Sequence, residues 1–295
     1  MKKLLLPFLL IFYLSGSAQS YFDLMKVDYG ESFEKKFKNS KHNTTLKSFG
    51  AEFTFPVLLN DSQALITGLD FTAHHLQLFP EASFSTLYSS TLKLGLASEW
   101  NDQWSSTLVL LPKLASDYRH FSSGDFHIGL FGLLKLKKKE NFSYKFGIYS
   151  SQEAYGIFAT PILGLNYKSP NEKLIIDLNL PISGDINYKF EKFILGIDYV
   201  GISRSYKIYQ ENIRLYSDLT SIDFSAYLQL PILKNIWLKG KVGFATNQFE
   251  VYDINEKVNW KLSAFTFGDK RTQLNPVMNP NIYFKIEALY RIPLT

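Results

Sequence analysis

Two groups of residues in this 295-residue chain have the side-chain types that chemistry requires. His74 and His75 stand together, and Asp70 lies four positions before His74, which is the same side of an extended strand. Four serines follow within sixteen residues, at Ser83, Ser85, Ser89 and Ser90. A histidine base beside a serine nucleophile and an orienting acid would support nucleophilic hydrolysis. Serine is also common in loops, so this spacing by itself assigns no catalytic residue.

A second group surrounds two further histidines. His120 and His127 flank a segment that contains Asp125, and Asp117 precedes it. These residue types can bind a metal ion, but their spacing matches no structural zinc pattern. Nor does a glycine-rich loop open a helix anywhere, as a phosphate-binding loop would. We therefore expect no metal and no cofactor.

Alternating polarity shows which elements position these residues. Segment 281–293 places Ile282, Phe284 and four more apolar residues on one side, with charged residues mostly on the other. Segments 49–55, 142–149, 174–180 and 221–230 alternate in the same way. A period of two is typical of strands with two different faces. No convincing 3.6-residue pattern follows residue 20, so the sequence predicts an all-β fold.

Fourteen runs of this kind are predicted as strands. They cover residues 22–31, 45–57, 63–76, 87–99, 104–115, 125–137, 142–151, 157–168, 173–182, 185–190, 193–206, 217–230, 236–250 and 281–293. The connections alternate in length: those near 101–103, 138–141 and 191–192 are short, whereas 32–44 and 251–280 are long. Membrane barrels have short turns at one end and longer loops at the other. We predict a transmembrane antiparallel up-and-down β-barrel of about 14 strands, with 12 as the alternative.

The first residues predict export. Lys2 and Lys3 precede an uncharged run at 4–14 and a small-residue stretch at 15–18, which is the signal-peptide order. We expect residues 1–18 to be the signal peptide, cleaved after Ala18, and 19–295 to be one barrel domain. The chain contains no cysteine, so packing and hydrogen bonds must hold it together. Its net charge of +5 includes two signal lysines and gives no reason to expect nucleic-acid binding.

Three stretches support a family resemblance. LVLLPKLASD at 108–117, GIFATPILGLNYKSPNEKLIIDLNLP at 156–181 and IYFKIEALYRIP at 282–293 resemble the uncharacterised outer-membrane β-barrel families of Bacteroidota. The SGSAQS that ends the signal also looks like theirs. The resemblance runs along nearly the whole mature chain and is one of pattern. It implies the barrel fold and a place in the Gram-negative outer membrane, and it carries over no active site.

In a barrel, the face opposite the apolar one lines the lumen. The charged residues predicted there are Glu52, Asp70, Lys93, Glu99, Lys145, Asp177, Asp198, Asp223, Lys239, Lys241, Lys285, Glu287 and Arg291. Charges that faced hydrocarbon would cost about 2–4 kcal/mol each for Lys or Arg near the midplane. The set could line a watery pore or could pair across the lumen and plug it. Because both signs are present, we favour pairing.

The leading functional interpretation is non-enzymatic: passive passage of small solutes, or a structural or partner-binding role. The alternatives are an outer-membrane lipid hydrolase with His74 or His75 as base, and a soluble periplasmic β-protein. Expected partners are outer-membrane lipids, the barrel-insertion machinery, and small solutes or a protein at the outer loops. Segment 251–280, whose VNWKLSAFTF could extend as a hairpin above the membrane, is the expected contact region.

Overall fold

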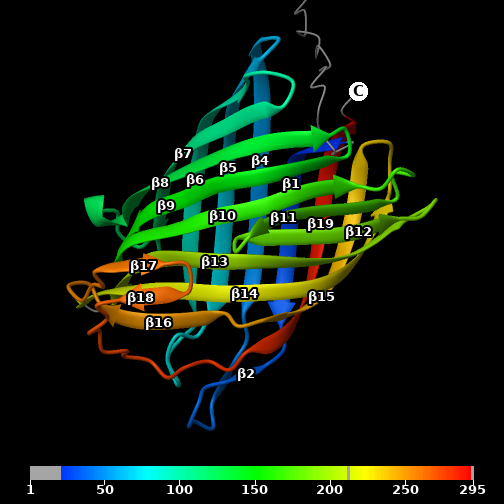
Figure 1. Cartoon of the computed structure of the whole chain (residues 1–295). Coiled ribbons are helices and arrows are strands. Elements are labelled where there is room, and N and C mark those ends of the chain that lie inside the picture. Colours follow the sequence, from blue (N-terminus) through cyan, green and yellow to red (C-terminus); the bar gives the residue numbers. More distant parts are fainter. Residues whose placement is uncertain (1–20, 211–212, 294–295) are drawn as a thin grey trace, which may run out of the picture.

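The structure, a computed structural model, describes residues 21–210 and 213–293, and its main element is one closed antiparallel barrel of 14 strands (Figure 1). The barrel strands are β1 Tyr21–Ser32, β4 Lys47–Asn60, β5 Gln63–Leu76, β6 Ser85–Glu99, β7 Trp104–Ser116, β8 Phe126–Lys139, β9 Phe142–Glu153, β10 Gly156–Lys168, β11 Leu174–Leu180, β12 Ser183–Lys189, β13 Ile194–Gln210, β14 Ile213–Pro231, β15 Ile236–Ala245 and β19 Asn281–Pro293. Each pairs with its neighbours along the chain, and β1 pairs with β19 from Tyr21↔Pro293 to Ser32↔Tyr283 to close the ring. The expected signal peptide at 1–18 lies outside the described residues.

All fourteen predicted strands are present, including the short one predicted at 185–190, which is β12. The predicted number of 14 is therefore confirmed over 12. Two predictions of detail are wrong. The outer loop predicted at 207–216 is wrong for residues 207–210 and 213–216, because these continue β13 and β14 as paired strands up to Gln210↔Ile213. The strand predicted at 236–250 is broken after Ala245. Gln248–Asp253 forms a separate strand, β16, which pairs with Leu215–Thr220 of β14, whereas β15 pairs with Asp223–Pro231.

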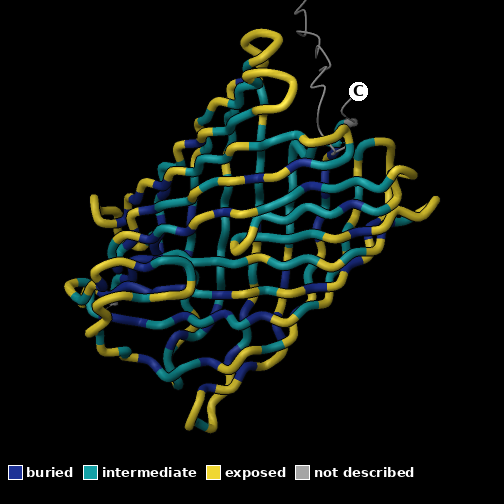
Figure 2. The backbone as a smooth tube through the Cα atoms, in the orientation of Figure 1, coloured by how far each residue is buried: buried dark blue, intermediate teal, exposed yellow. Residues whose placement is uncertain are grey.

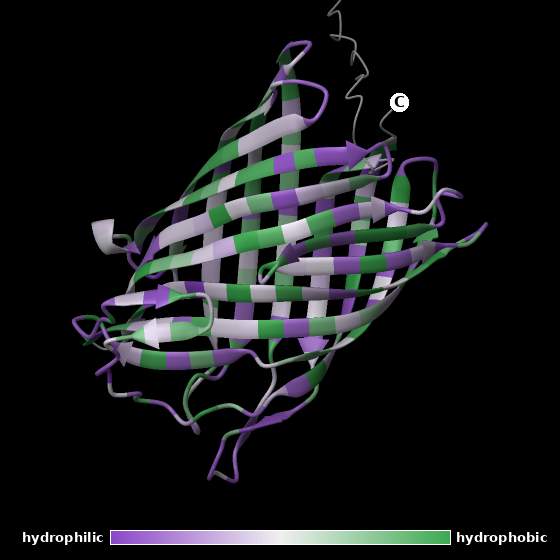
Figure 3. Cartoon of the chain, viewed as in Figure 1, coloured by the Kyte–Doolittle hydropathy of each residue, from purple (hydrophilic) through white to green (hydrophobic). Residues whose placement is uncertain are grey.

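The outward face of the barrel carries an apolar belt. Its members are half exposed to the surroundings, as at Leu163 (63%), Leu108 (56%) and Ile286 (58%), although a soluble protein would bury such side chains. Hydropathy alternates along each strand (Figure 3). An apolar outer face around a polar interior is the pattern of a membrane barrel, and it does not fit the soluble alternative. Among the described residues no helix is long and apolar enough to cross a bilayer.

Exposed aromatic residues gather toward both ends of this belt. Trp100, Tyr188 and Phe190 lie at the end with short turns, which we call the short-turn end. Phe84 and Phe121 lie at the opposite, long-loop end. Aromatic girdles at both interfaces are typical of membrane barrels. Their positions indicate that the membrane surrounds the barrel between them.

Smaller elements gather at the long-loop end. They are the hairpin β2 Lys35–Lys36 and β3 Asn43–Thr44, the 3₁₀ turn η1 Ser123–Asp125, and the strands β16, β17 Trp260–Leu262 and β18 Phe265–Phe267. The expected hairpin in 251–280 forms as β17 and β18. It does not stand free above the barrel, however, because β17 pairs in parallel with β10 at Ile157–Ala159 and extends the wall there.

The wall is irregular where β11 and β12 are only seven residues long. β12 accompanies β13 only as far as Val200, and β11 accompanies β10 only from Leu163 onward. The remaining half of β13, residues 201–210, therefore has no β12 beside it. Paired with β14, this half bends into the barrel, where residues 205–208 and 215–219 are buried (Figure 2). We call residues 201–210 and 213–220 the inward hairpin.

Candidate lumen and its closed end

An apolar cluster fills the lumen at the long-loop end. The inward hairpin contributes Tyr206, Ile208, Leu215 and Leu219, none more than 6% exposed. The facing residues come from β5, β6, β7 and β16 and from the loops next to β2, β4, β5 and β19: Phe37, Leu46, Leu76, Leu78, Leu87, Ala115, Phe249, Val251 and Met278. Side chains from opposite walls thus meet inside the barrel. We call this cluster the apolar seal.

The inward hairpin reaches the far wall and is fixed there by backbone contacts. Lys207 forms a parallel bridge with Ser116 at the end of β7. The Asp117 N–H donates to the Lys207 carbonyl at 3.0 Å, and the Asp117 carboxylate accepts from the Tyr209 N–H at 3.0 Å. These bonds occupy edge groups of β13 that a neighbouring strand would otherwise pair. The inward position of β13 is therefore satisfied by the wall it crosses to.

Glu153, at the end of β9, provides a second attachment. Its Oε2 accepts from the Ser205 N–H at 2.8 Å and from the Ser205 hydroxyl at 2.7 Å. Its Oε1 pairs with the ammonium of Lys113 on β7 and accepts from Ser151. Glu153 and Lys113 are both buried, so each supplies the counter-charge that the other needs. One carboxylate thus links two wall strands, β7 and β9, to the inward hairpin.

A second layer covers the inward hairpin from outside. Lys261 of β17 lies 3.4 Å from the Asp218 carboxylate and donates to Thr220 at 2.7 Å. Arg271 reaches the same carboxylate at 3.1 Å and also bonds to Asp269 at 2.9 Å, which lowers the pKa of Asp269 in this outer loop. The hairpin is therefore enclosed between the seal on one side and loop 251–280 on the other.

Behind the seal lies a polar cavity of about 280 Å³. β1, β4, β5, β13, β14, β15 and β19 line it, and charged side chains of both signs face it. Arg204, on the inward hairpin, projects into it and donates to the Thr72 hydroxyl at 2.7 Å. His74 also faces it, with its ring against Tyr206 and Phe249 of the seal. The cavity is thus lined by charged groups, and the inward hairpin borders it through Ile202 and Arg204.

Seven of the thirteen predicted lumen residues are brought together around this cavity: Glu52, Asp70, Asp198, Asp223, Lys241, Lys285 and Glu287. Most are paired. Glu52 binds Lys26 at 2.7 Å and also Lys93, whereas Lys241 binds Asp198 at 2.6 Å and Glu287 at 3.0 Å.

The other predicted lumen residues lie close by or apart. Lys239 joins the cavity pairs at 3.8 Å from Asp198 and from Glu287. Lys145 and Asp177 form a separate pair at 2.6 Å. Arg291 binds Asp23, and Glu99 ends β6, so both of these lie toward the short-turn end. Ion pairs therefore also form outside the cavity, between strands that are adjacent or two apart in the wall.

Four inward-facing residues were missing from the prediction although the alternation could have found them. Lys26 and Asp28 line the cavity from β1, and Arg204 has the same parity as Asp198 on β13. Glu153 likewise has the parity of Lys145 on β9, two residues past the predicted strand end. What no pattern indicated is that the wall would bend and bring Glu153 against β13.

The histidine groups do not assemble into sites. His74 faces the lumen and its Nδ1 has no hydrogen-bond partner, whereas Nδ1 of His75 lies 2.9 Å from the Thr86 hydroxyl and its ring stacks on Phe84. Ser90, one of the four candidate serines, accepts instead from the Tyr118 hydroxyl. His120 packs against Tyr209, and His127 is buried beside β7. Within residues 21–210 and 213–293 no cluster of three or more potential metal ligands occurs.

Comparison with known proteins gives a likeness of shape. No family model and no curated protein matches the sequence. Among solved structures, an outer-membrane channel from Pseudomonas putida F1 aligns with TM-score 0.46 and 8% identity, covering 95% of this chain and 98% of that one. The KdgM porin in complex with disordered oligogalacturonate aligns with TM-score 0.36 and 10% identity, covering 90% of this chain and 98% of that one. The translocator domain of autotransporter NalP from Neisseria meningitidis aligns with TM-score 0.41 and 8% identity, covering 92% of this chain and 89% of that one. These neighbours are outer-membrane porins, channels and a translocator, and at such values none transfers a substrate to this chain.

Proposed function

We propose that this chain is an outer-membrane barrel that passes small polar solutes through its lumen, and that the inward hairpin closes the passage. The observation that carries the proposal is the charged cavity roofed by a hairpin of the wall itself. A barrel that served only as an inert plug would not need an internal space of charged groups. The volume of about 280 Å³ and the charged groups of both signs that face this cavity favour small polar solutes.

The inward hairpin has the construction of a gate. It is continuous with the wall through β13 and β14, and its β13 edge is held by polar contacts to Ser116, Asp117, Ser122 and Glu153. Opening would also require the hairpin to leave the apolar seal and Asp218 to separate from Lys261 and Arg271. The pairing between β13 and β14 would not have to break.

A reversible crosslink tests the gate. The chain has no cysteine, so Ser116→Cys with Lys207→Cys would introduce one defined pair at the bridge between β7 and β13. In planar bilayers we expect the oxidised double variant to show no channel openings and the reduced one to show them. The matched control is Ser98→Cys with Ser106→Cys, which joins β6 to β7 within the wall. Oxidation of this control should leave conductance unchanged.

Two results would count against the proposal. If neither wild type nor any variant conducts, including one in which a short turn replaces residues 202–221, the passage itself is refuted. If the oxidised and reduced Ser116/Lys207 variants conduct equally, passage stands but the hairpin is no gate.

The route to the membrane belongs to the same proposal. The predicted signal peptide at 1–18 would direct export, and the barrel-insertion machinery of a Gram-negative cell would then assemble the strands. The pattern shared with barrel families of Bacteroidota supports that cell type.

A further inference from the structure

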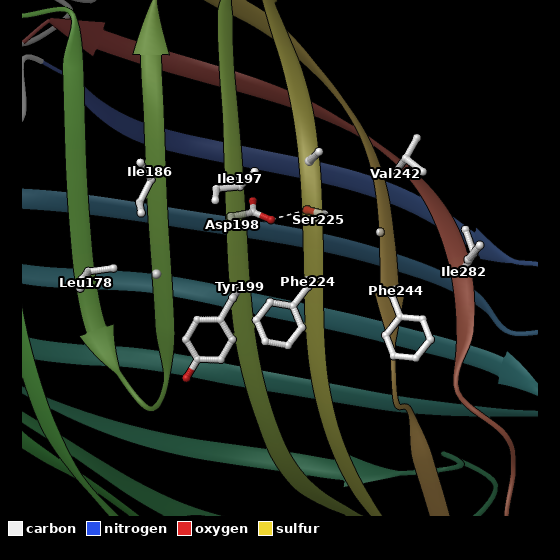
Figure 4. A pocket seen from close by; sticks show the side chains of 13 residues that line it. Leu178, Ile186, Ile197, Asp198, Tyr199, Phe224, Ser225, Val242, Phe244 and Ile282 are labelled. Carbon is white, nitrogen blue, oxygen red and sulfur yellow. Dashed lines mark hydrogen bonds between the residues drawn. The ribbon is translucent and has the colours of Figure 1, made fainter.

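An apolar hollow of about 580 Å³ lies on the outward face of the barrel, across β11 to β15 and β19 (Figure 4). Leu178, Ile186, Ile197, Phe224, Val242 and Ile282 are among the side chains that line it. Apart from Leu178, these side chains are between about 37% and 57% exposed and belong to the apolar belt. The hollow is therefore a local recess in the surface that faces lipid.

Cross-strand register explains the recess. Tyr199, Phe224 and Phe244 stand side by side in one row, and the first two rings stack with centroids 5.4 Å apart. In the next row Ala226 sits between Ile197 and Val242. A methyl group thus occupies a position where the surrounding belt has large side chains.

The polar groups near the hollow are already bonded within the protein. The Ser225 hydroxyl donates to the Asp198 carboxylate, which also binds Lys241 in the lumen. The Tyr199 hydroxyl donates to the Pro181 carbonyl. Water in the hollow would therefore find few of the two to four polar partners that an ordered water needs. An empty recess would forfeit the contacts of its lining atoms, so hydrocarbon is the favourable occupant.

We propose that this hollow is a binding site for one acyl chain of an outer-leaflet lipid, which rests on the proposed membrane placement. Its residues lie in the half of the belt toward the long-loop end, near the starts of β12 and β19 and the end of β15. The hollow is continuous with the belt, so a chain can enter from the bilayer. Its volume is within the range of about 300–1,000 Å³ in which proteins hold small ligands.

Tryptophan quenching by brominated lipid would test the site. Phe224→Trp places a reporter in the hollow, and Phe55→Trp places one on the belt at β4, outside it. Each reporter is measured as the difference from the parent chain in phosphatidylcholine vesicles that contain an increasing fraction of dibrominated phosphatidylcholine. The dibrominated lipid is then diluted with ordinary lipid, and quenching is followed at each reporter. We expect the relative association constant of the dibrominated lipid at position 224 to be at least about threefold above that at position 55.

Filling the recess supplies the second arm. Ala226→Leu in the Phe224→Trp chain should remove the excess association, whereas Ala51→Leu, at an outward position on β4, should not. Unchanged β-type circular dichroism would show that both variants fold. Equal association at positions 224 and 55, or an excess that survives Ala226→Leu, would overturn the site. If bromine quenches neither reporter, the membrane placement itself fails.

Discussion

At the scale of single residues, Glu153 carries more of the closed conformation than any one contact in the seal. Glu153 is buried. Its carboxylate pairs with the buried Lys113 ammonium and accepts a hydrogen bond from the Ser205 N–H of the inward hairpin. Hydrogen bonds to charged groups contribute more than neutral ones. Loss of this side chain would leave Lys113 as a buried charge without its counter-ion.

We therefore expect Glu153→Ala to lower the free energy of unfolding by about 3–5 kcal/mol, as breaking a buried pair does. The matched control is Glu140→Ala, which removes an exposed partner of Lys137 at a turn and should cost below about 1 kcal/mol. Urea unfolding in detergent micelles measures both. If both variants lose a similar free energy of unfolding, the buried pair stabilises the fold no more than the exposed pair does.

The site could be predicted from the sequence only in part. Alternation was enough to direct Glu52, Asp198 and Glu287 inward, because charge on the lipid face is too costly. Alternation gives the face of a residue but not its depth or its partner across the lumen. This is why Lys145 and Asp177 were grouped with cavity residues although they form a pair of their own.

At the scale of elements, each strand needs one face compatible with lipid, so period-two patterns located most of the fourteen strands, although 104–114 and 126–137 alternate poorly. The ends of β13 and β14 were missed because lipid touches neither face there. Ile208 and Leu215 pack into the seal, whereas Lys207 on the other face lies 3.6 Å from the Asp125 carboxylate. Because polar residues then occur without a lipid-facing apolar row, such a segment resembles a loop in the sequence.

The belt makes a prediction about β7. Leu110 faces outward and is 44% exposed, whereas Thr107 has the inward parity of Lys113. We expect Leu110→Lys to destabilise the barrel by about 2–4 kcal/mol in lipid vesicles, and Thr107→Lys to cost clearly less. Equal costs in a vesicle refolding titration would contradict the assignment of the two faces.

At the scale of the whole molecule, the two ends of the barrel differ in what they offer to a partner. The short-turn end has turns such as 61–62 and 140–141, and the long-loop end has the hairpin β2–β3 and segment 251–280. A barrel inserted from the periplasm keeps its longer loops outside. The long-loop end should therefore face the medium.

Epitope insertion checks this orientation. A tag placed after Asn39, in the exposed turn between β2 and β3, should bind antibody on intact cells. The same tag after Asn171, in the exposed turn between β10 and β11, should bind only after the outer membrane is opened. Labelling of the Asn171 tag on intact cells would reverse the proposed topology.

The closure of this barrel by its own wall has a mechanical consequence. A separate plug domain can leave a pore without changing its perimeter, but the inward hairpin is also part of the circumference through β13 and β14. Its outward swing would bring the edge of β13 toward β10, where β17 already pairs with Ile157–Ala159. Opening would therefore require β17 to leave β10 at the same time, which makes segment 251–280 a latch on the pore.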